Sequence, residues 1–211
     1  MARGRHTRAA EIPTALRANL SRRGLVGDNP VVQLRPDYPV LTPRLTLRPL
    51  TESDVEIMLA YRGRPDVCRY LPFEPMTRDI LMARLAGDLS MTEITQEGQA
   101  LTLGVEVTEF ERLIGDVVLF FHSGLYRSGE LGYVFDPVAG GQGYATEACT
   151  AMLAMAFGDL GLRRVVARIV NGNTRSVRLA ERLGMHREPH LERTVMFKGQ
   201  QSEELVYAIQ R

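Results

Sequence analysis

GGQGYATEA, residues 140–148, places three glycines within four residues, directly before a segment with helical spacing. Glycine is unfavourable inside a helix and loses more conformational freedom on folding than other residues. Two explanations fit this pattern. The glycines form a simple turn, or an anion approaches the backbone closely at the N-terminus of a helix, where unpaired amides and the helix dipole attract negative charge. The rest of the sequence decides between them.

The composition excludes several classes of protein. A chain of 211 residues is long enough for one domain with a complete core, with or without an appendage. No apolar segment reaches the length of a membrane span, and the N-terminus lacks the apolar core of a signal peptide, so we expect a cytoplasmic protein without membrane contact. The two cysteines and four histidines lack the spacing of metal ligands, so we expect no metal.

Charge is distributed unevenly along the chain. Residues 1–36 contain seven arginines but only two acidic residues, although the whole chain has a net charge of +1. We predict a basic N-terminal arm over residues 1–40, with a short helix at 13–23 and a proline-rich linker, followed by one domain over 41–211. We expect this arm to be solvated or packed on a partner, for example in a homodimer, rather than bound to nucleic acid.

Hydrophobic periodicity predicts an α+β fold. A strand at 44–50 and helical segments within 51–94 precede three strand-like runs within 100–136, whose short polar gaps indicate an antiparallel meander. A helix, a buried strand, a second helix and a final hairpin follow, over 143–158, 163–170, 173–184 and 191–210. The sheet is therefore mixed and mostly antiparallel, with flanking helices. The glycine segment lies at the strand-to-helix junction of its one strand–helix–strand crossover.

Two nucleotide-binding motifs fail at this junction. A P-loop needs a lysine after its last glycine, and none is present within residues 140–148. A dinucleotide fingerprint needs three spaced glycines, and residues 141–146 supply two; the following strand also lacks the acidic residue that would hold a ribose. The junction nevertheless remains an anion site in principle.

A longer stretch carries a resemblance to a known family. Residues 136–185, DPVAGGQGYATEACTAMLAMAFGDLGLRRVVARIVNGNTRSVRLAERLGM, resemble the acetyl-CoA-binding core of the GNAT N-acyltransferase superfamily. The family's pyrophosphate motif, Arg/Gln-x-x-Gly-x-Gly/Ala, falls on residues 140–145, and Gly140 departs from the usual first residue. The segments YATEA, NTRS and ERLGM and the opening LTPRLTLRPLTESD look most like the ribosomal-protein N-terminal acetyltransferase branch. The resemblance covers about residues 41–211.

The resemblance implies a GNAT fold and an acetyl-CoA site. Backbone amides after the meander would cradle the pyrophosphate of acetyl-CoA, and Gly143 would leave room for it. These amides belong to Gly141, Gln142, Gly143, Tyr144, Ala145 and Thr146. The pantetheine arm would lie in a cleft beside strand 129–135, where an amide at Val134 or Phe135 would polarise the thioester carbonyl. Asn173 would position the coenzyme or start the helix that follows it.

The family pattern also identifies candidate catalytic groups. Many family members use a tyrosine to protonate the departing sulfur, and the matching position here is Ala180. Ser176 is the nearest substitute, unless it only caps the helix. Glu130 matches an acidic residue of the family pattern and is the leading candidate for the base, directly or through water; the alternative is a surface carboxylate. His122 is a second candidate, although a surface histidine is the more usual interpretation.

We therefore expect an acetyl-CoA-dependent N-acetyltransferase that acts on a primary amine, in particular the α-amine of a protein or peptide. The alternatives are acetylation of a small-molecule amine, or an acyl-CoA-binding or interaction module on the same fold with little turnover. In this fold the early helices and the last hairpin hold the acceptor, so segments 62–76 and 192–201 would set specificity. Neither segment contains a motif that identifies the acceptor.

Overall fold

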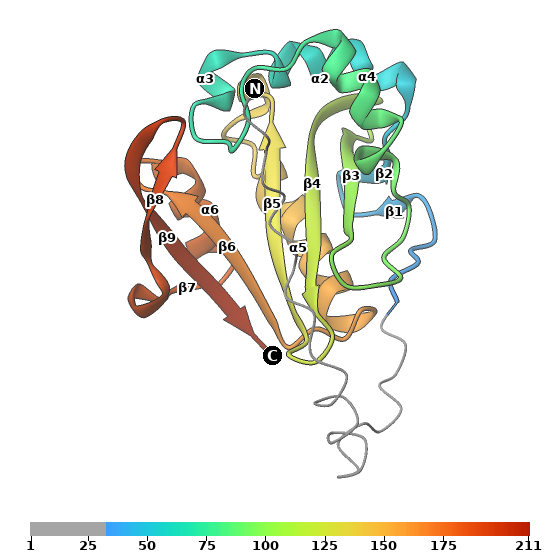
Figure 1. The fold of residues 1–211 in the computed structure, drawn as a ribbon. Coiled ribbons are helices and arrows are strands. Elements are labelled where there is room, and N and C mark those ends of the chain that lie inside the picture. Colours follow the sequence, from blue (N-terminus) through green and yellow to red (C-terminus); the bar gives the residue numbers. More distant parts are fainter. Residues whose placement is uncertain (1–32) are drawn as a thin grey trace, which may run out of the picture. The chain divides into compact units, whose positions relative to one another are not determined.

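The computed structural model describes residues 33–211 (Figure 1). The predicted helix at 13–23 and most of the predicted arm lie outside the described residues, and the division of the chain at residue 41 stays a prediction. The described chain joins the core before that point. Leu34 is 1% exposed and exchanges two backbone hydrogen bonds with Ile94, at 2.8 and 2.9 Å.

Within residues 33–211, nine strands form one sheet in the order β1-β2-β3-β4-β5-β6-β9-β7, with β8 paired to β9. The strands are β1 (Val40–Leu41), β2 (Leu45–Pro49), β3 (Ala100–Val107), β4 (Arg112–Ser123), β5 (Ser128–Phe135), β6 (Arg164–Val170), β7 (His186–Arg187), β8 (Arg193–Phe197) and β9 (Gln200–Gln210). The predicted meander β3–β4–β5 and the final hairpin β8–β9 are confirmed as antiparallel pairs. The short strand β7 was not expected.

Helices cover both faces of this sheet (Figure 1). They are α2 (Val55–Arg62), α3 (Pro65–Cys68), α4 (Arg78–Leu85), α5 (Tyr144–Gly158) and α6 (Thr174–Arg182). Helices α5 and α6 share the main core on one face, whereas α2 and α4 build a second core on the other. None of the helices in the described part of the chain is long and apolar enough to cross a membrane.

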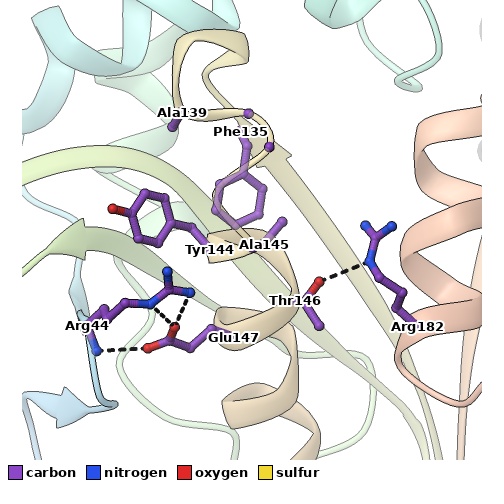
Figure 2. A pocket seen from close by; sticks show the side chains of 11 residues that line it. Arg44, Phe135, Ala139, Tyr144, Ala145, Thr146, Glu147 and Arg182 are labelled. Atoms are coloured by element: carbon purple, nitrogen blue, oxygen red, sulfur yellow. Dashed lines mark hydrogen bonds and ion pairs between the residues drawn. The ribbon is translucent and has the colours of Figure 1, made fainter.

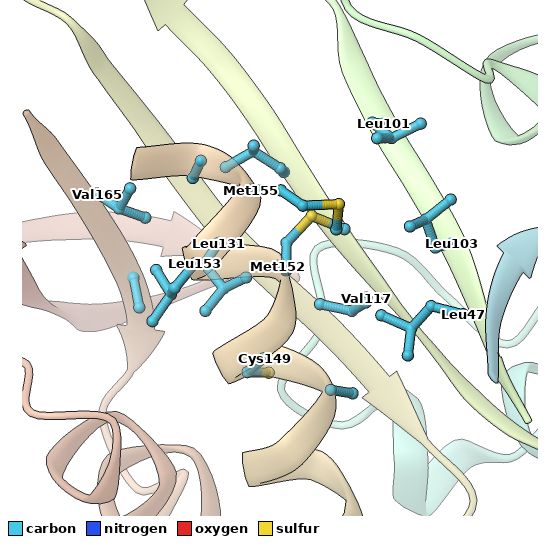
Figure 3. Close-up of a cluster of buried hydrophobic side chains, with 14 of the residues drawn as sticks. Leu47, Leu101, Leu103, Val117, Leu131, Cys149, Met152, Leu153, Met155 and Val165 are labelled. Atoms are coloured by element: carbon cyan, nitrogen blue, oxygen red, sulfur yellow. The ribbon is translucent and has the colours of Figure 1, made fainter. Parts of the chain in front are cut away.

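Helix α5 is held by the apolar stripe that its sequence predicts. Ala148, Met152 and Ala156 are fully buried, at 0% exposure, because positions four residues apart share one face of a helix. Figure 3 shows Met152 among side chains of the sheet such as Val117 and Leu131. A buried side chain of this size contributes roughly 1.5–3 kcal/mol. This packing fixes where the N-terminus of α5 points.

The second core anchors β5 from the opposite face. Met58 of α2 and Leu81 of α4 pack with Leu113 of β4 and Val134 of β5, and all four are at most 7% exposed. Because side chains alternate along a strand, β5 contributes even-numbered residues to this face and odd-numbered residues to the face under α5. Strand β5 therefore lies between two cores.

The predicted crossover β5–α5–β6 is confirmed, and its two strands diverge. They pair in parallel only at their first residues, Ser128–Glu130 with Arg164–Val166. Farther along, residues 131–135 pair with β4 and residues 167–170 pair with β9, so the neighbours of the two strands separate. Figure 1 shows β5 and β6 starting close together and then splaying apart. We call the space between residues 131–135 and 167–170 the gap.

Candidate active site

The glycine segment links the end of β5 to the start of α5. Asp136 accepts a hydrogen bond from the N–H of Val138 at 3.1 Å and starts a 3-10 turn at Pro137–Ala139. Gly141 and Gly143 then have φ angles of 82° and 80°, in the left-handed region that glycine tolerates best. Gly143 is the N-cap of α5. The turn itself therefore requires glycine at these two positions, whatever else it binds.

The turn leaves a row of amide donors without backbone acceptors. Within residues 33–211, the N–H groups of residues 141–146 donate to no backbone oxygen, and the N–H of Glu147 is the first to do so, to Gly143 at 3.1 Å. Such amides, together with a helix dipole equivalent to about half a positive charge, make this N-terminus attractive to an anion.

Two arginines add positive charge beside the turn (Figure 2). Arg44 donates from Nη1 to the carbonyl of Gln142 at 3.0 Å, and its guanidinium lies 4.7 Å from the ring centre of Tyr144. Arg182, from α6, donates from Nε to Oγ1 of Thr146 at 3.3 Å. Guanidinium groups are well suited to phosphate oxygens because they offer several donors in one plane.

Hydrogen bonds to Glu147 link the first turn of α5 to the segment before β2. Its Oε1 accepts from Oγ1 of Thr42 at 2.6 Å and from the N–H of Arg44 at 2.9 Å, while Oε2 accepts from Nε of Arg44 at 2.8 Å. Burial works against ionisation of this carboxyl, but the hydrogen bonds from Thr42 and Arg44 outweigh it and hold the pKa of Glu147 below its usual value. The contacts of Glu147 with Thr42 and Arg44 are therefore structural.

A cavity of about 670 Å³, called here the turn cavity, lies over these groups. Its lining includes Arg44, Phe135, Gly140, Gly141, Gly143, Tyr144, Ala145, Thr146 and Arg182. Gln142, a predicted contact, does not line the cavity, and its carbonyl faces Arg44 instead. Unpaired amides, a helix N-terminus and two guanidinium groups together fit a pyrophosphate.

The amides of Val134 and Phe135 are the two predicted hydrogen-bond donors to the thioester carbonyl. The direction in which each amide points distinguishes between them. The N–H of Asp136 donates to Ile114 of β4 at 2.8 Å, whereas the carbonyl of Arg127 accepts from Arg164 of β6 at 3.1 Å. Because peptide groups alternate sides along a strand, even-numbered amides face β4 and odd-numbered amides face β6. The amide of Val134 therefore points into the sheet, and that of Phe135 points toward the gap.

A second cavity of about 390 Å³, called here the gap cavity, occupies the gap. It is lined by residues 130–134 of β5 and 167–170 of β6, and by Tyr70–Phe73 after α3 and Val195 and Phe197 of β8. The structure therefore brings the two segments expected to hold the acceptor, 62–76 and 192–201, to the wall of one cavity.

Glu130 lines this cavity and is tied into a chain of charged groups. Its Oε2 lies 3.1 Å from Nε2 of His122 and accepts from Nε of Arg168 at 3.2 Å. Arg168 also donates to Glu204 at 3.2 Å, and Arg193 donates to the same carboxylate at 3.0 Å. The two sequence candidates for the base thus contact each other, and the side chain of Glu130 is 22% exposed.

Asn173 and Ser176 line the gap cavity from α6. Asn173 is the N-cap of α6, and its Oδ1 accepts from the N–H of Ser176 at 3.2 Å. Asn173, and not Ser176, therefore caps the helix. The main-chain carbonyl of Ser176 accepts a separate hydrogen bond from the hydroxyl of Tyr133 at 3.4 Å. Ala180, where the family tyrosine would stand, is 1% exposed in the main core.

The acetyltransferase (GNAT) domain family matches residues 44–186, a span that contains both the turn and the gap. This chain is a member of the GNAT acetyltransferase family. The uncharacterized N-acetyltransferase YoaA of Bacillus subtilis is 28% identical over 173 residues, covering 82% of this chain and 97% of that relative. This GNAT protein is accordingly an N-acetyltransferase, and its family uses acetyl-CoA.

Solved structures confirm the GNAT fold. The spermidine N-acetyltransferase of Vibrio cholerae, in complex with CoA and spermine, has a TM-score of 0.67 at 23% identity over 80% of this chain and 96% of its own. The ribosomal-protein-S5-alanine acetyltransferase of Vibrio fischeri has a TM-score of 0.69 at 19% identity over 82% of this chain and 97% of its own. These two enzymes share the fold, although their names give different acceptors, a polyamine and a ribosomal protein.

Three residues near the two cavities were missed by sequence reasoning. Arg44 lies in a predicted strand and Arg182 in a predicted helix, and in an arginine-rich sequence neither stands out. Arg168 interrupts an apolar strand, RVVARIV, and this interruption is the one signal that could have identified it. All three are placed by contacts between elements far apart in the chain.

Proposed function

We propose that this enzyme transfers the acetyl group of acetyl-CoA to the α-amine of a protein or peptide. One observation carries the proposal: the turn cavity, which suits a pyrophosphate, lies beside a gap in the sheet that contains a carboxylate. Phe135 lines the turn cavity, and its neighbours in β5 line the gap cavity. A donor held at the turn would extend its thioester along β5 into the gap.

The donor contacts follow from this placement. The amides of residues 141–146, with Arg44 and Arg182, would hold the pyrophosphate. The amide of Phe135 faces the gap and would polarise the thioester carbonyl, which is the group that acetyl-CoA supplies for attack. Asn173 would contact the coenzyme through its side-chain nitrogen, since its Oδ1 already accepts the capping hydrogen bond.

Glu130 and Ser176 would act on the two sides of the reacting carbon. Glu130 would accept the amine proton, directly or through one water molecule, while the new C–N bond forms. The hydroxyl of Ser176 would hydrogen-bond to the sulfur as the C–S bond breaks. His122 and Arg168 would hold the carboxylate of Glu130 in place, since both contact the same oxygen.

An α-amine depends less on a strong catalytic base than a lysine amine does. At pH 7 on the order of a tenth of an α-amine with a pKa of about 7.7–8.0 is neutral, whereas a lysine amine with a pKa of about 10.4 is neutral in about one molecule in 2,500. The candidate base, Glu130, is a carboxylate that already accepts a hydrogen bond from Arg168. A site without a stronger base would favour an amine that is often neutral already, and the likeness to the N-terminal acetyltransferase branch agrees.

A matched pair of peptides tests this acceptor class. One peptide has a free N-terminus and blocked lysines, and the other has a blocked N-terminus and free lysines. With the full chain and acetyl-CoA at pH 7, we expect the first to be acetylated about 250-fold faster, in line with the ratio of neutral amines. The ratio should narrow above pH 8, because the α-amine is then mostly neutral while lysine continues to gain neutral form.

A polyamine provides the third arm of the same experiment. A cavity of about 390 Å³ is near the lower end of the range for small-molecule sites, so a small amine is the second candidate. Faster acetylation of spermidine than of either peptide would assign the site to small amines. Preference for the lysine peptide would contradict both proposals.

A further inference from the structure

Tyr133 is a largely buried phenol at the boundary of the gap. It projects from β5, its ring packs against the core under α5 and α6, and it lines the gap cavity. Its hydroxyl donates to the main-chain carbonyl of Ser176 at 3.4 Å, a long hydrogen bond. The phenol therefore lies at the first turn of α6, and its oxygen is held only loosely there.

Glu130 and Tyr133 reach one cavity from opposite faces of the sheet. Even-numbered Val134 packs with α2 and α4, whereas odd-numbered Tyr133 packs with α5 and α6. Both Glu130 and Tyr133 nevertheless line the gap cavity, because β5 and β6 have separated at this level. An amine and a leaving sulfur can therefore occupy opposite sides of a carbonyl placed between them.

Ala180 lies one helical turn beyond Ser176, the residue that Tyr133 contacts. Residues 176 and 180 lie one turn apart on the same face of α6, the face that Tyr133 approaches. Ala180 is 1% exposed, and its cluster is the one against which the ring of Tyr133 packs. The position at which many family members have a tyrosine is thus alanine here, and a phenol from β5 contacts the same helix one turn earlier.

We propose that Tyr133 is a catalytic residue that donates its phenolic proton to the leaving thiolate. This inference rests on the proposed acetyl transfer. The C–N bond forms as the amine proton passes to Glu130, and the C–S bond breaks as the proton of Tyr133 passes to sulfur. After CoA departs, Glu130 releases the amine proton to water and the phenolate takes one proton back from water, so atoms and charges balance over one turnover.

The buried surroundings of Tyr133 favour the protonated phenol, which is the form that a proton donor requires. Burial raises the pKa of the Tyr133 phenol, against a smaller opposing effect of its hydrogen bond to Ser176. A thiolate formed in the same gap is desolvated too, which makes it a stronger base than in water. Burial raises the pKa of the nearby Cys149 thiol in the same way. Burial thus raises the pKa of the proton donor and of the accepting sulfur in the same direction.

Tyr133→Phe removes the hydroxyl and little else, and Tyr38→Phe is its matched control. Tyr38 also donates to a main-chain carbonyl, that of Thr92, at 2.7 Å, away from both cavities. We expect Tyr133→Phe to lower kcat about a hundredfold, within the range of general acid catalysis, with acetyl-CoA affinity unchanged. Tyr38→Phe should retain the original kcat. Equal rates in the two variants would overturn the proposal.

A second measurement needs no turnover. The thiol of bound CoA can be titrated through the ultraviolet absorbance of its thiolate. A phenol within hydrogen-bonding distance stabilises that thiolate, so the thiol should ionise at higher pH in Tyr133→Phe than in the original chain or in Tyr38→Phe. Identical titrations would place the phenol away from sulfur and contradict the proposal.

Fluorotyrosine at position 133 covers the case in which Tyr133→Phe does not fold, because it keeps both ring and hydroxyl. Its phenol is more acidic, so the alkaline limb of the kcat profile should move to lower pH, and an unmoved limb would overturn the proposal. If the original chain releases no CoA thiol with any amine, the proposed function fails. If it turns over and the Tyr133 variants match their controls, only the role of Tyr133 fails.

Discussion

The turn and the gap are two halves of one site built by different means. The turn consists of consecutive residues, and its donors are main-chain amides fixed by the φ angles of Gly141 and Gly143. The gap consists of side chains from β4, β5, β6, α6 and β8, held by contacts such as Glu130 to Arg168 across 38 positions of sequence. A backbone site tolerates changes in its side chains, whereas a side-chain site changes with each of its members.

This difference predicts how each half fails. Replacing Gly141 or Gly143 should remove donor binding altogether, because a new side chain changes φ and enters the space beside the amides. A substitution in the gap should leave donor binding intact and change the rate. The three predictions below test that separation, from the largest expected effect to the smallest.

Gly143→Leu should abolish the binding of CoA. A ligand at about 100 times its Kd stabilises a protein by roughly 2.7 kcal/mol, which for a chain of this length raises Tm by about 5–10 °C. Differential scanning fluorimetry should show that rise in the original chain and none in Gly143→Leu. Backbone strain alone would also lower Tm, so the ligand-induced rise, and not Tm itself, is the measurement.

Gly98→Leu controls for that strain. Gly98 has a φ of 83°, close to that of Gly143, and a side chain added there would meet nothing within 4 Å. We expect Gly98→Leu to be destabilised and still show the full rise with CoA. A full rise in Gly143→Leu as well would show that the turn does not hold the donor.

Glu130→Gln should lower kcat/KM by about 100-fold, at the low end of general-base contributions. The loss should be greatest at low pH and should shrink as pH rises, because an amine that is already neutral needs less help. Binding of CoA should be unchanged. A loss that is the same at every pH would assign Glu130 a positioning role instead.

Glu188→Gln is the matched control for Glu130→Gln. Both carboxylates pair with an arginine of β6, and the side chains of Glu130 and Glu188 are similarly buried, at 22% and 20% exposure. Glu188 does not line either cavity. Its replacement should leave kcat/KM and its pH dependence unaltered, so a matching loss there would point to a general effect of a broken ion pair.

Ser176→Ala should have the smallest effect, a two- to tenfold fall in kcat, the equivalent of one neutral hydrogen bond of roughly 0.5–1.5 kcal/mol. The main-chain groups of Ser176 that bond to Asn173 and Tyr133 remain in this variant. Stability and CoA affinity should therefore match those of the original chain. A fall as large as that of Tyr133→Phe would make Ser176 the principal proton donor.

Local patterns predicted much of the fold. The period-2 runs of β3, β4 and β5 and the apolar stripe of α5 identify these elements, because each depends on residues close together in the chain. Strand β7 was missed because two residues, His186 and Arg187, carry no periodicity and are extended only by their pairing with β9. The same limit applies to the site: the turn is one consecutive stretch of sequence, whereas the contacts of Glu130 with His122 and Arg168 depend on strands that meet only in the fold.

The sequence by itself determined the α+β fold, the position of the glycine turn and the unusual Ala180, since each follows from residue type and spacing along the chain. Only the tertiary structure decided that the amide of Phe135, and not that of Val134, faces the gap. It also decided that Glu130 shares one oxygen between His122 and Arg168, and that Tyr133 reaches the first turn of α6. The physical reason is that strand register and the divergence of β5 from β6 set these contacts, and both depend on packing between segments distant in sequence.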